Sequence, residues 1–286
     1  MRCLFLFILI ATARIVAAQP IEARPAGGCA ELLTAATHSG TTMRYAFGAA
    51  RGGAAPDARI AVVMLVGGGG HVDLDDKGCA QKLNRNSLLR MMPLLRDAGI
   101  ATVLVDAPSD QQGDDGLGGF RIAAEHARDL GRVIAEVRTR TRAAVWIMGH
   151  SRGTISAANA AARLEGSSAP DGLVLLSSMM VGNPKAKKSW VAQTVFSVDM
   201  DAIKIPLLLV GHAADSCVRS PAVMMADVAA KTKGARQQVV TVAGGPGASG
   251  RAQGLEVCEV GEPHDFVGQE IEVAAGIVRF MRGGSY

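Results

Sequence analysis

The sequence has 286 residues, of which 49% are hydrophobic and 20% are charged, and this suits one domain of the larger α/β type with a single apolar core. The 30 basic and 26 acidic residues leave a net charge of only +4, so the composition gives no reason to expect nucleic acid or an anionic surface as a partner. After the N-terminal segment, no apolar run reaches the roughly 18 to 20 residues of a membrane span. We therefore expect no stable membrane insertion.

The N-terminal segment is typical of a secretory signal peptide. Arg2 precedes a short apolar run over 4–13, and small residues at 16–18 form a cleavage site. An uncleaved membrane anchor is the alternative, but the apolar run is short for one. We expect a signal peptide over 1–18, a single domain over 19–286 and a secreted or periplasmic location.

Strand-like and helix-like runs alternate along most of the remaining chain. Expected strands cover 60–66, 100–105, 143–148, 173–176, 206–211 and 237–242, and an early, antiparallel strand at 42–47 is a further candidate. Expected helices cover 87–98, 120–140, 154–164, 221–233 and 266–281. This alternation predicts an α/β fold with a mostly parallel central sheet and helices on both faces. Two segments interrupt it, at 177–204 and at 244–263.

The segment Gly149-His150-Ser151-Arg152-Gly153 matches the pattern G-x-S-x-G and lies between an expected strand and an expected helix. In that context a serine is forced into a sharp turn that exposes its hydroxyl, and the flanking glycines relieve backbone clashes. The sequence therefore predicts a nucleophile at Ser151. A chance turn is the alternative, because glycine is common in this chain.

A serine hydroxyl needs a base and a group that orients the base. Asp215 follows the expected strand 206–211, and His264 follows the last expected strand, just before the terminal helix. We predict that His264 takes the proton of Ser151 and that Asp215 fixes the tautomer of His264. Asp199 and Asp201 are alternatives to Asp215, but they precede the strand. Asp265 is expected to cap the last helix.

The tetrahedral intermediate of acyl transfer also needs donors for its oxyanion. The backbone N–H of Arg152 is one candidate, and the glycine run 67–70, which follows the strand 60–66, offers the second. We choose Gly69 first and Gly70 next; a merely flexible turn is the alternative. The run does not match a nucleotide-binding pattern, since it lacks G-x-G-x-x-G and a P-loop lysine. We therefore expect no organic cofactor.

Export would leave four cysteines in the mature chain, and four cysteines allow three disulfide pairings. A bond from Cys217 to Cys258 would tie the loop of Asp215 to the loop of His264, which leaves Cys29 for Cys79. Free buried thiols are the alternative. Cysteine and histidine spacings give no sign of a metal site.

Taken together, these motifs resemble the α/β-hydrolase superfamily over roughly residues 60–281, although no subfamily is identified. The resemblance implies acyl transfer to water through an acyl-serine. Many members carry His-Gly before the first oxyanion donor, where this chain has Val66-Gly67. Such folds often insert a lid where this chain has 177–204, which is short, so we expect a minimal lid and an open site that Trp190 or the Met179-Met180 pair lines.

We therefore expect a serine hydrolase of carboxylesterase type that acts on small-molecule esters. A thioesterase, amidase or acyltransferase could use the same three side chains, because the fold does not set the substrate. A non-catalytic binding protein on the same scaffold is an alternative of another class.

Overall fold

The computed structural model describes residues 29–51, 60–259 and 261–286. Its centre is an eight-stranded sheet with the order β1-β2-β4-β3-β5-β6-β7-β8. The strands are β1 (Glu31–Ala36), β2 (Thr42–Gly48), β3 (Ile60–Leu65), β4 (Ile100–Val105), β5 (Ala144–His150), β6 (Gly172–Leu176), β7 (Leu207–His212) and β8 (Gln237–Val242). The β1–β2 and β2–β4 pairs are antiparallel, and all the others are parallel.

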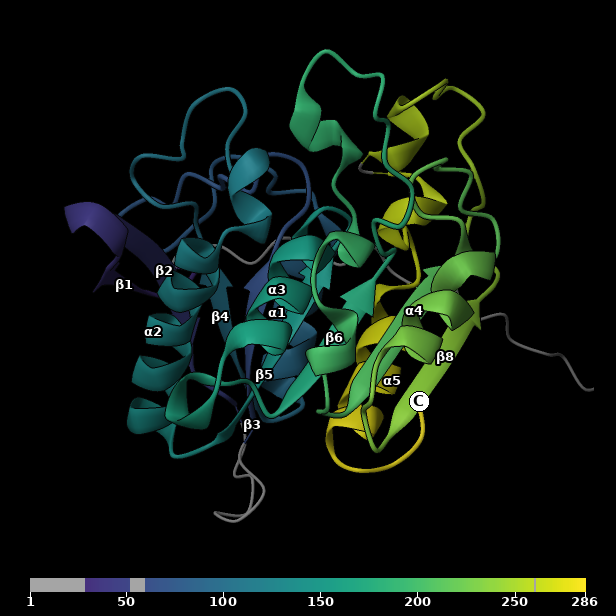
Figure 1. The fold of residues 1–286 in the computed structure, drawn as a ribbon. Coiled ribbons are helices and arrows are strands. Elements are labelled where there is room, and N and C mark those ends of the chain that lie inside the picture. Colours follow the sequence, from purple (N-terminus) through teal and green to yellow (C-terminus); the bar gives the residue numbers. More distant parts are fainter. Residues whose placement is uncertain (1–28, 52–59, 260) are drawn as a thin grey trace, which may run out of the picture.

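Helices cover both faces of the sheet (Figure 1). They are α1 (Ser87–Asp97), α2 (Ala124–Thr141), α3 (Gly153–Arg163), α4 (Met225–Lys231) and α5 (Glu270–Met281). The side chains of α2, α3 and α4 pack into one apolar cluster, and those of α1 and α5 pack into a second cluster on the other face. The predicted architecture is therefore confirmed.

Strand β5 shows why the sheet can separate two cores. Successive side chains of a strand point to opposite faces. Val145 and Ile147 accordingly belong to the cluster with α2 and α3, whereas Trp146 and Met148 belong to the cluster with α1 and α5. Because both faces are buried, the strand is a continuous apolar run.

The sequence patterns missed or displaced a few elements. Strand β1 was not predicted, and its exposed and partly buried residues lack the continuous apolar run of the inner strands. Helix α5 begins at Glu270 instead of 266, because Phe266 adopts a left-handed conformation (φ 51°) that ends the preceding turn. The predicted signal peptide, 1–18, lies outside the described residues.

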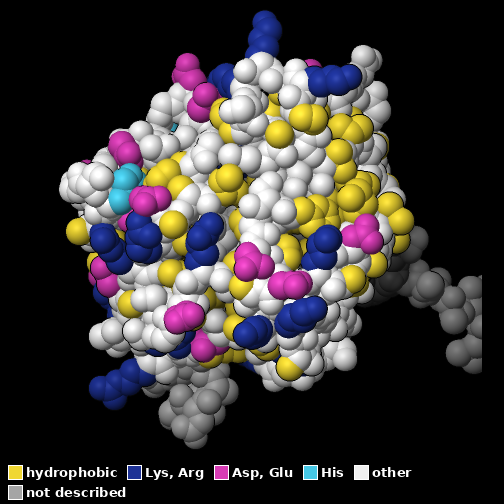
Figure 2. Space-filling view, in the orientation of Figure 1, with side chains coloured by type: hydrophobic (Ala, Val, Ile, Leu, Met, Phe, Trp, Pro, Cys, Tyr) yellow, Lys and Arg dark blue, Asp and Glu magenta, His cyan; other side chains and the backbone are white. Residues whose placement is uncertain are grey.

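The molecular surface mixes both signs of charge. Figure 2 shows Lys and Arg side chains interspersed with Asp and Glu over the face seen there. In the part of the chain that the structure describes, none of the helices combines the length and the apolarity that crossing a membrane requires.

Candidate active site

Ser151 occupies the tight turn that joins β5 to α3. Its backbone has φ 52°, a conformation that costs free energy for a residue with a side chain. The turn is close-packed: a Cβ at Gly149 would collide with the backbone of Gly153, and one at Gly153 would collide with the Leu65 carbonyl at the end of β3. The two glycines of the motif are therefore steric requirements of the turn.

Two backbone hydrogen bonds hold this turn in place. The N–H of Ser151 donates to the carbonyl of Leu176 at the end of β6 (2.9 Å). The carbonyl of Ser151 accepts from the N–H of Thr154 in α3 (3.0 Å). Among the described residues, the Ser151 hydroxyl has no hydrogen-bond partner, and the residue is 7% exposed. The hydroxyl is thus fixed at the carboxyl edge of the sheet without being committed to a structural bond.

His264 is fully buried and is positioned through its own backbone. Its carbonyl accepts from Nε2 of His150 (3.0 Å), the residue before Ser151, and from Oγ of Ser177 (2.7 Å), which follows β6. The rings of His150 and His264 lie 5.2 Å apart. These contacts bring the loop before α5 against the elbow.

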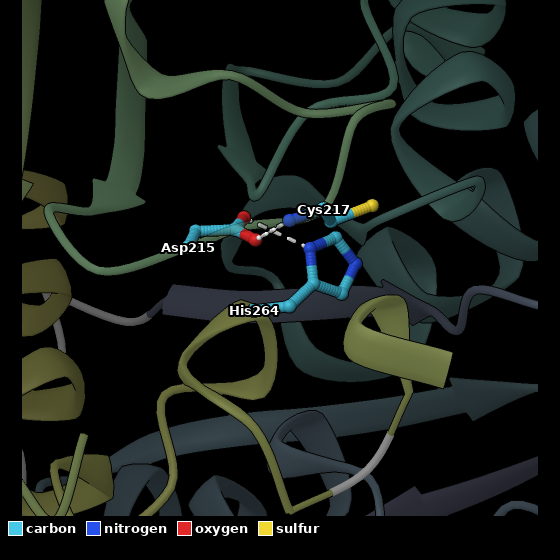
Figure 3. Close-up of side chains that lie close together, drawn as sticks. All are labelled: Asp215, Cys217 and His264. Carbon is cyan, nitrogen blue, oxygen red and sulfur yellow. Dashed lines mark hydrogen bonds and ion pairs between the residues drawn. The ribbon is translucent and has the colours of Figure 1, made fainter. Parts of the chain in front are cut away.

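The side chain of His264 is oriented by two groups of the loop after β7. Its Nδ1 lies 2.9 Å from Oδ2 of Asp215, and both side chains are fully buried (Figure 3). Ser220 Oγ lies 2.9 Å from the same Nδ1 and 3.0 Å from the same carboxylate oxygen. The other ring nitrogen, Nε2, is buried and has no hydrogen-bond partner among the described residues.

The carboxylate of Asp215 belongs to a small network that Cys217 completes. The N–H of Cys217 donates to Oδ1 of Asp215 (2.8 Å), so both carboxylate oxygens are engaged. Cys217 is bonded to Cys258 and Cys29 is bonded to Cys79, the pairing that the loop positions suggested. The Cys217–Cys258 bond therefore ties the loop of Asp215 to the loop that carries His264.

Asp215, Cys217 and His264 also form a cluster of potential metal ligands, with their ligand atoms within 4.8 Å of one another (Figure 3). The sulfur of Cys217 belongs to a disulfide and cannot act as a thiolate. Two ligand groups remain, which is fewer than the three or four that a protein zinc site provides. The cluster is better described as a hydrogen-bonded pair beside a disulfide.

His150 is a supporting residue of the elbow. Its Nε2 donates to the His264 carbonyl, so its Nδ1 accepts from the side-chain amide of Asn86 (3.1 Å). Burial lowers the pKa of His150, which keeps the ring neutral at neutral pH. This environment agrees with the packing role expected from its position in the motif.

Asp265 corrects an expectation from the sequence. Its carboxylate does not cap α5, the helix that follows it. It accepts instead from the N–H of Ser87, the first residue of α1 (2.9 Å), and from the guanidinium of Arg90 (3.1 Å). The first-turn carboxylates of α5 are Glu270 and Glu272. The residue next to His264 thus anchors its loop to α1.

The glycine turn after β3 lies against the elbow through Gly67. A Cβ at Gly67 would be 2.9 Å from the Cβ of Ser151. The N–H of Gly70 donates to the carbonyl of Gly67 (3.0 Å), so Gly70, the second choice as an oxyanion donor, is unavailable. Within the described residues, the N–H groups of Gly68, Gly69 and Arg152 have no acceptor.

Arg121 braces this turn, a role that the sequence did not suggest. Its fully buried guanidinium donates to the carbonyls of Val66 (3.3 Å) and Gly68 (3.1 Å) and to Oγ of Ser156 (2.9 Å). The carbonyl of Gly69 accepts from the N–H of Leu117 (2.8 Å). With their carbonyls held from one side, the peptide groups of the turn have a fixed orientation.

No family model matches the sequence, and no curated protein matches it. Solved structures do. The ferulic acid-bound form of Est1E from Butyrivibrio proteoclasticus is 14% identical, with a TM-score of 0.59 over 87% of this chain and 97% of that chain. An α/β serine hydrolase homologue from Coxiella burnetii is 16% identical, with a TM-score of 0.55 over 90% and 99%.

The chain has the α/β-hydrolase fold. A third neighbour, described as a member of the α/β serine hydrolases without lid, comes from Xanthomonas campestris. It is 17% identical, with a TM-score of 0.52 over 87% of this chain and 92% of that chain. At these identities the likeness shows the fold alone. The short segment 177–204 contains three 3-10 turns; its first part rises beyond the carboxyl edge of the sheet, and its last part returns to the amino end of β7 (Figure 1).

The residues expected to line the site differ in placement. Met179 and Met180 are buried in the apolar cluster on the α3 face of the sheet. Trp190, in the 3-10 turn Ser189–Ala192, is partly exposed and stacks on the guanidinium of Arg152, next to the elbow. Trp190 is therefore the one of these three that lies beside the candidate nucleophile.

Proposed function

We propose that this chain is an exported serine hydrolase that cleaves carboxylic esters through a covalent acyl-serine intermediate. One observation carries the proposal above all others. Asp215 and Ser220 hold Nδ1 of His264, while Nε2 is left without a partner in the described chain, beside the elbow that presents Ser151. Proton transfer from a serine requires a base that is oriented through one ring nitrogen and whose other nitrogen is available to the hydroxyl.

The proposed reaction has two stages. In the first, Ser151 Oγ attacks the ester carbonyl carbon while His264 Nε2 takes the hydroxyl proton, and Asp215 stabilises the resulting imidazolium. The imidazolium then gives that proton to the departing alkoxide, which leaves as an alcohol. The acyl group stays bound to Oγ of Ser151. In the second stage, His264 takes a proton from water, the hydroxide attacks the acyl-serine, and the carboxylic acid leaves as Ser151 regains its proton.

Backbone amides would stabilise the oxyanion that forms in each stage. The N–H of Arg152 is one donor in this proposal, and Gly69 remains our predicted second donor. The N–H of Gly68 competes with it, because the preceding Gly67 packs so near Ser151 that a Cβ at Gly67 would lie 2.9 Å from the Cβ of Ser151. Each such donor is worth about 10²- to 10³-fold in rate. The nucleophile, base and oxyanion donors all come from the chain, so we propose that the reaction uses no metal or organic cofactor.

Two further observations support the ester substrate and the export. The structural neighbours include Est1E, which was solved with ferulic acid, and a propionate-bound esterase from Thermogutta terrifontis. Both disulfides support an oxidising compartment, where such bonds form and persist. The segment 177–204 is short, which favours small substrates that reach an open site.

Labelling with a fluorophosphonate probe tests the proposal directly. We expect the wild-type protein to be labelled, and we expect Ser151→Ala to lose both the label and about 10⁶-fold of its turnover of p-nitrophenyl esters. Ser216→Ala, at an exposed serine of the Asp215 loop, is the matched control and should keep both. A folded, oxidised wild-type protein that takes no label would favour the non-catalytic binding protein. Amide and thioester analogues define the bond that is cleaved.

A further inference from the structure

Arg152 has a second feature besides its backbone N–H: its side chain is fixed next to the nucleophile. The guanidinium carbon of Arg152 lies 4.1 Å from the ring centroid of Trp190. Trp190 in turn rests on Gly118, where a Cβ would come within 2.9 Å of the indole nitrogen. Stacking of this kind holds a guanidinium in one place without using its N–H groups. The cation is therefore positioned, yet its donors are still available.

A second arginine lies close enough to Arg152 for the two positive charges to repel each other. Arg219 belongs to the loop after β7 and immediately precedes Ser220, which contacts His264. The carbonyl of Arg219 accepts from the N–H groups of Met180 (2.8 Å) and Val181 (3.0 Å), and this fixes its backbone against the segment after β6. Arg152 thus directly follows the candidate nucleophile Ser151, and Arg219 directly precedes Ser220, which contacts the candidate base His264.

Neither guanidinium is bonded to an acid within the described part of the chain. There, the side chains of Arg152 and Arg219 make no hydrogen bond and no ion pair, and Nη2 of Arg152 is buried without an acceptor. Burial, with a contribution from nearby Arg219, lowers the pKa of Arg152 to about 10, so the charge persists at neutral pH. The nearby acid Asp115 is already ion-paired with Lys188.

Arg121 adds to the positive potential behind the glycine turn. It is fully buried, and its hydrogen bonds go to two carbonyls and one hydroxyl instead of a carboxylate. A buried cation without a counter-charge costs free energy, and natural proteins usually pair such groups. The guanidiniums of Arg152, Arg219 and Arg121 form no hydrogen bond or ion pair with an acid of the described chain, so this region suits a ligand that brings the negative charge itself.

We propose that Arg152 and Arg219 form a subsite that selects esters carrying a carboxylate, in either the acyl group or the alcohol group. The inference rests on the proposed ester hydrolysis and names its substrate class. A carboxylate is planar and accepts two parallel hydrogen bonds from a guanidinium, a match that a neutral ester group lacks. The partial burial of Arg152 strengthens the interaction, because water competes less for the ion pair.

Two matched pairs of esters test the subsite and separate its two forms. On the acyl side, 4-nitrophenyl hydrogen glutarate is compared with its methyl ester; on the alcohol side, 4-acetoxybenzoate is compared with its methyl ester. We expect the anionic member of at least one pair to have a kcat/KM about 10- to 100-fold higher, mainly through KM, as charge-assisted hydrogen bonds provide. The preference should fall to within about threefold in Arg152→Gln and in Arg219→Gln.

Lys204→Gln is the matched control, since it removes one exposed positive charge before β7, at the amino edge of the sheet. The anionic preference should survive in this variant. Equal kcat/KM values within both pairs of the wild-type protein would overturn the subsite, and so would a preference that both arginine variants retain. Melting temperatures near that of the wild-type protein show that the variants are folded.

A second measurement separates this inference from the proposed function. If the protein takes no fluorophosphonate and cleaves none of the four esters, the proposed function is wrong. Calorimetric titration of Ser151→Ala with 4-acetoxybenzoate then decides the subsite separately. Binding that weakens about tenfold or more when Arg152→Gln is added supports the subsite. The same titration is made with 4-nitrophenyl hydrogen glutarate, and the subsite is overturned if neither ester binds or if the added substitution leaves the binding of both unchanged.

Discussion

The two sides of the candidate active site differ in how fully the chain satisfies its own polar groups. On the histidine side, both carboxylate oxygens of Asp215 and Nδ1 of His264 are hydrogen-bonded, and a disulfide joins the two loops. On the arginine side, the guanidiniums of Arg152 and Arg219 have no hydrogen bond within the described chain, and one of them stacks on Trp190.

In the proposed mechanism, this difference separates the groups that orient the base from the groups that bind the substrate. A base must keep one geometry through the whole catalytic cycle, so its partners belong to the protein and remain in place. A substrate subsite must exchange its partner in every cycle, and a guanidinium without an internal partner is ready to do so. His264 combines the two conditions in one ring, because Nδ1 is held and Nε2 has no partner among the described residues.

On the histidine side, we expect the largest loss of activity from Asp215→Asn. An amide in this position favours the wrong tautomer of His264 and cannot stabilise the imidazolium, and such a change costs about 10⁴-fold in kcat in a serine protease triad. We expect a fall of that order in p-nitrophenyl ester turnover, with the melting temperature as a check on folding. Asp199→Asn, at an exposed acid before β7, should keep full activity. Comparable activity in the two variants would exclude Asp215 from the mechanism.

The two disulfides allow the effect of a bond beside the candidate active site to be compared with that of a similar bond away from it. They close loops of similar length, with sequence separations of 50 and 41 residues, so chain entropy predicts similar stabilisation, about 4 kcal/mol each. The Cys217–Cys258 bond adjoins Asp215, whereas the Cys29–Cys79 bond joins the start of β1 to the loop before α1. We expect Cys217→Ser/Cys258→Ser to lower kcat about tenfold or more in folded protein, because misplacement by about 1 Å can cost 10²-fold.

The matched variant Cys29→Ser/Cys79→Ser should lose a similar amount of stability and keep its kcat. Urea denaturation gives the stability of both variants, and steady-state kinetics well below the midpoint gives kcat. Equal kcat values in the two double variants would mean that the bond beside Asp215 stabilises the fold without positioning the loops.

Patterns along the sequence predicted the sheet, the helices and the elbow, because each depends on neighbouring residues. Buried parallel strands are apolar runs, and the glycines around Ser151 are required by a local turn. The loops of Asp215 and His264 could be chosen by their order after the strands. Strand β1 has no such run, and its placement depends on pairing with β2.

Contacts between distant segments could not be read in the same way. Ser220 has no sequence pattern that connects it with His264, and the stacking of Arg152 on Trp190 joins segments from different parts of the fold. Asp265 likewise bonds to α1 instead of the adjacent helix, because tertiary packing places the N–H of Ser87 nearer. No sequence pattern indicated that Arg152 and Arg219 lack partners, because the absence of a partner is visible only in the three-dimensional structure.

His126 sharpens the comparison, because it is a buried polar group that has no hydrogen-bond partner among the described residues. Both ring nitrogens are buried without a partner in the described chain, and the ring packs against Phe120 (5.3 Å between centroids). Burial, with added repulsion from Arg121, lowers the pKa of His126 to about 3. Unlike the arginines, this side chain can lose its charge, and it stays neutral in the folded protein.

The pH dependence of stability follows from this shift. Between pH 6.5, the ordinary pKa, and about 3, the unfolded chain binds a proton at His126 that the folded chain does not bind. Stability should therefore fall as the solution is acidified through this window, by about 1.4 kcal/mol per pH unit for one proton. His126→Leu removes that proton-binding group. The free energy of unfolding of this variant should therefore fall less steeply on acidification, by about 1.4 kcal/mol per pH unit, as measured by urea denaturation between pH 7 and pH 4.5.

His38 provides a control of opposite sign for this last prediction. Partial burial lowers the pKa of His38, but hydrogen bonds to Asp129 and Asp110 more than offset that effect, so the pKa is raised overall. Its stabilisation is fully present below pH 6.5 and is lost as the pH rises through the raised value. His38→Asn should therefore lower stability more at pH 5 than at pH 8, whereas His126→Leu should raise it at pH 5 relative to pH 8. Equal slopes in the wild-type protein and His126→Leu would mean that water or local motion already satisfies the buried ring.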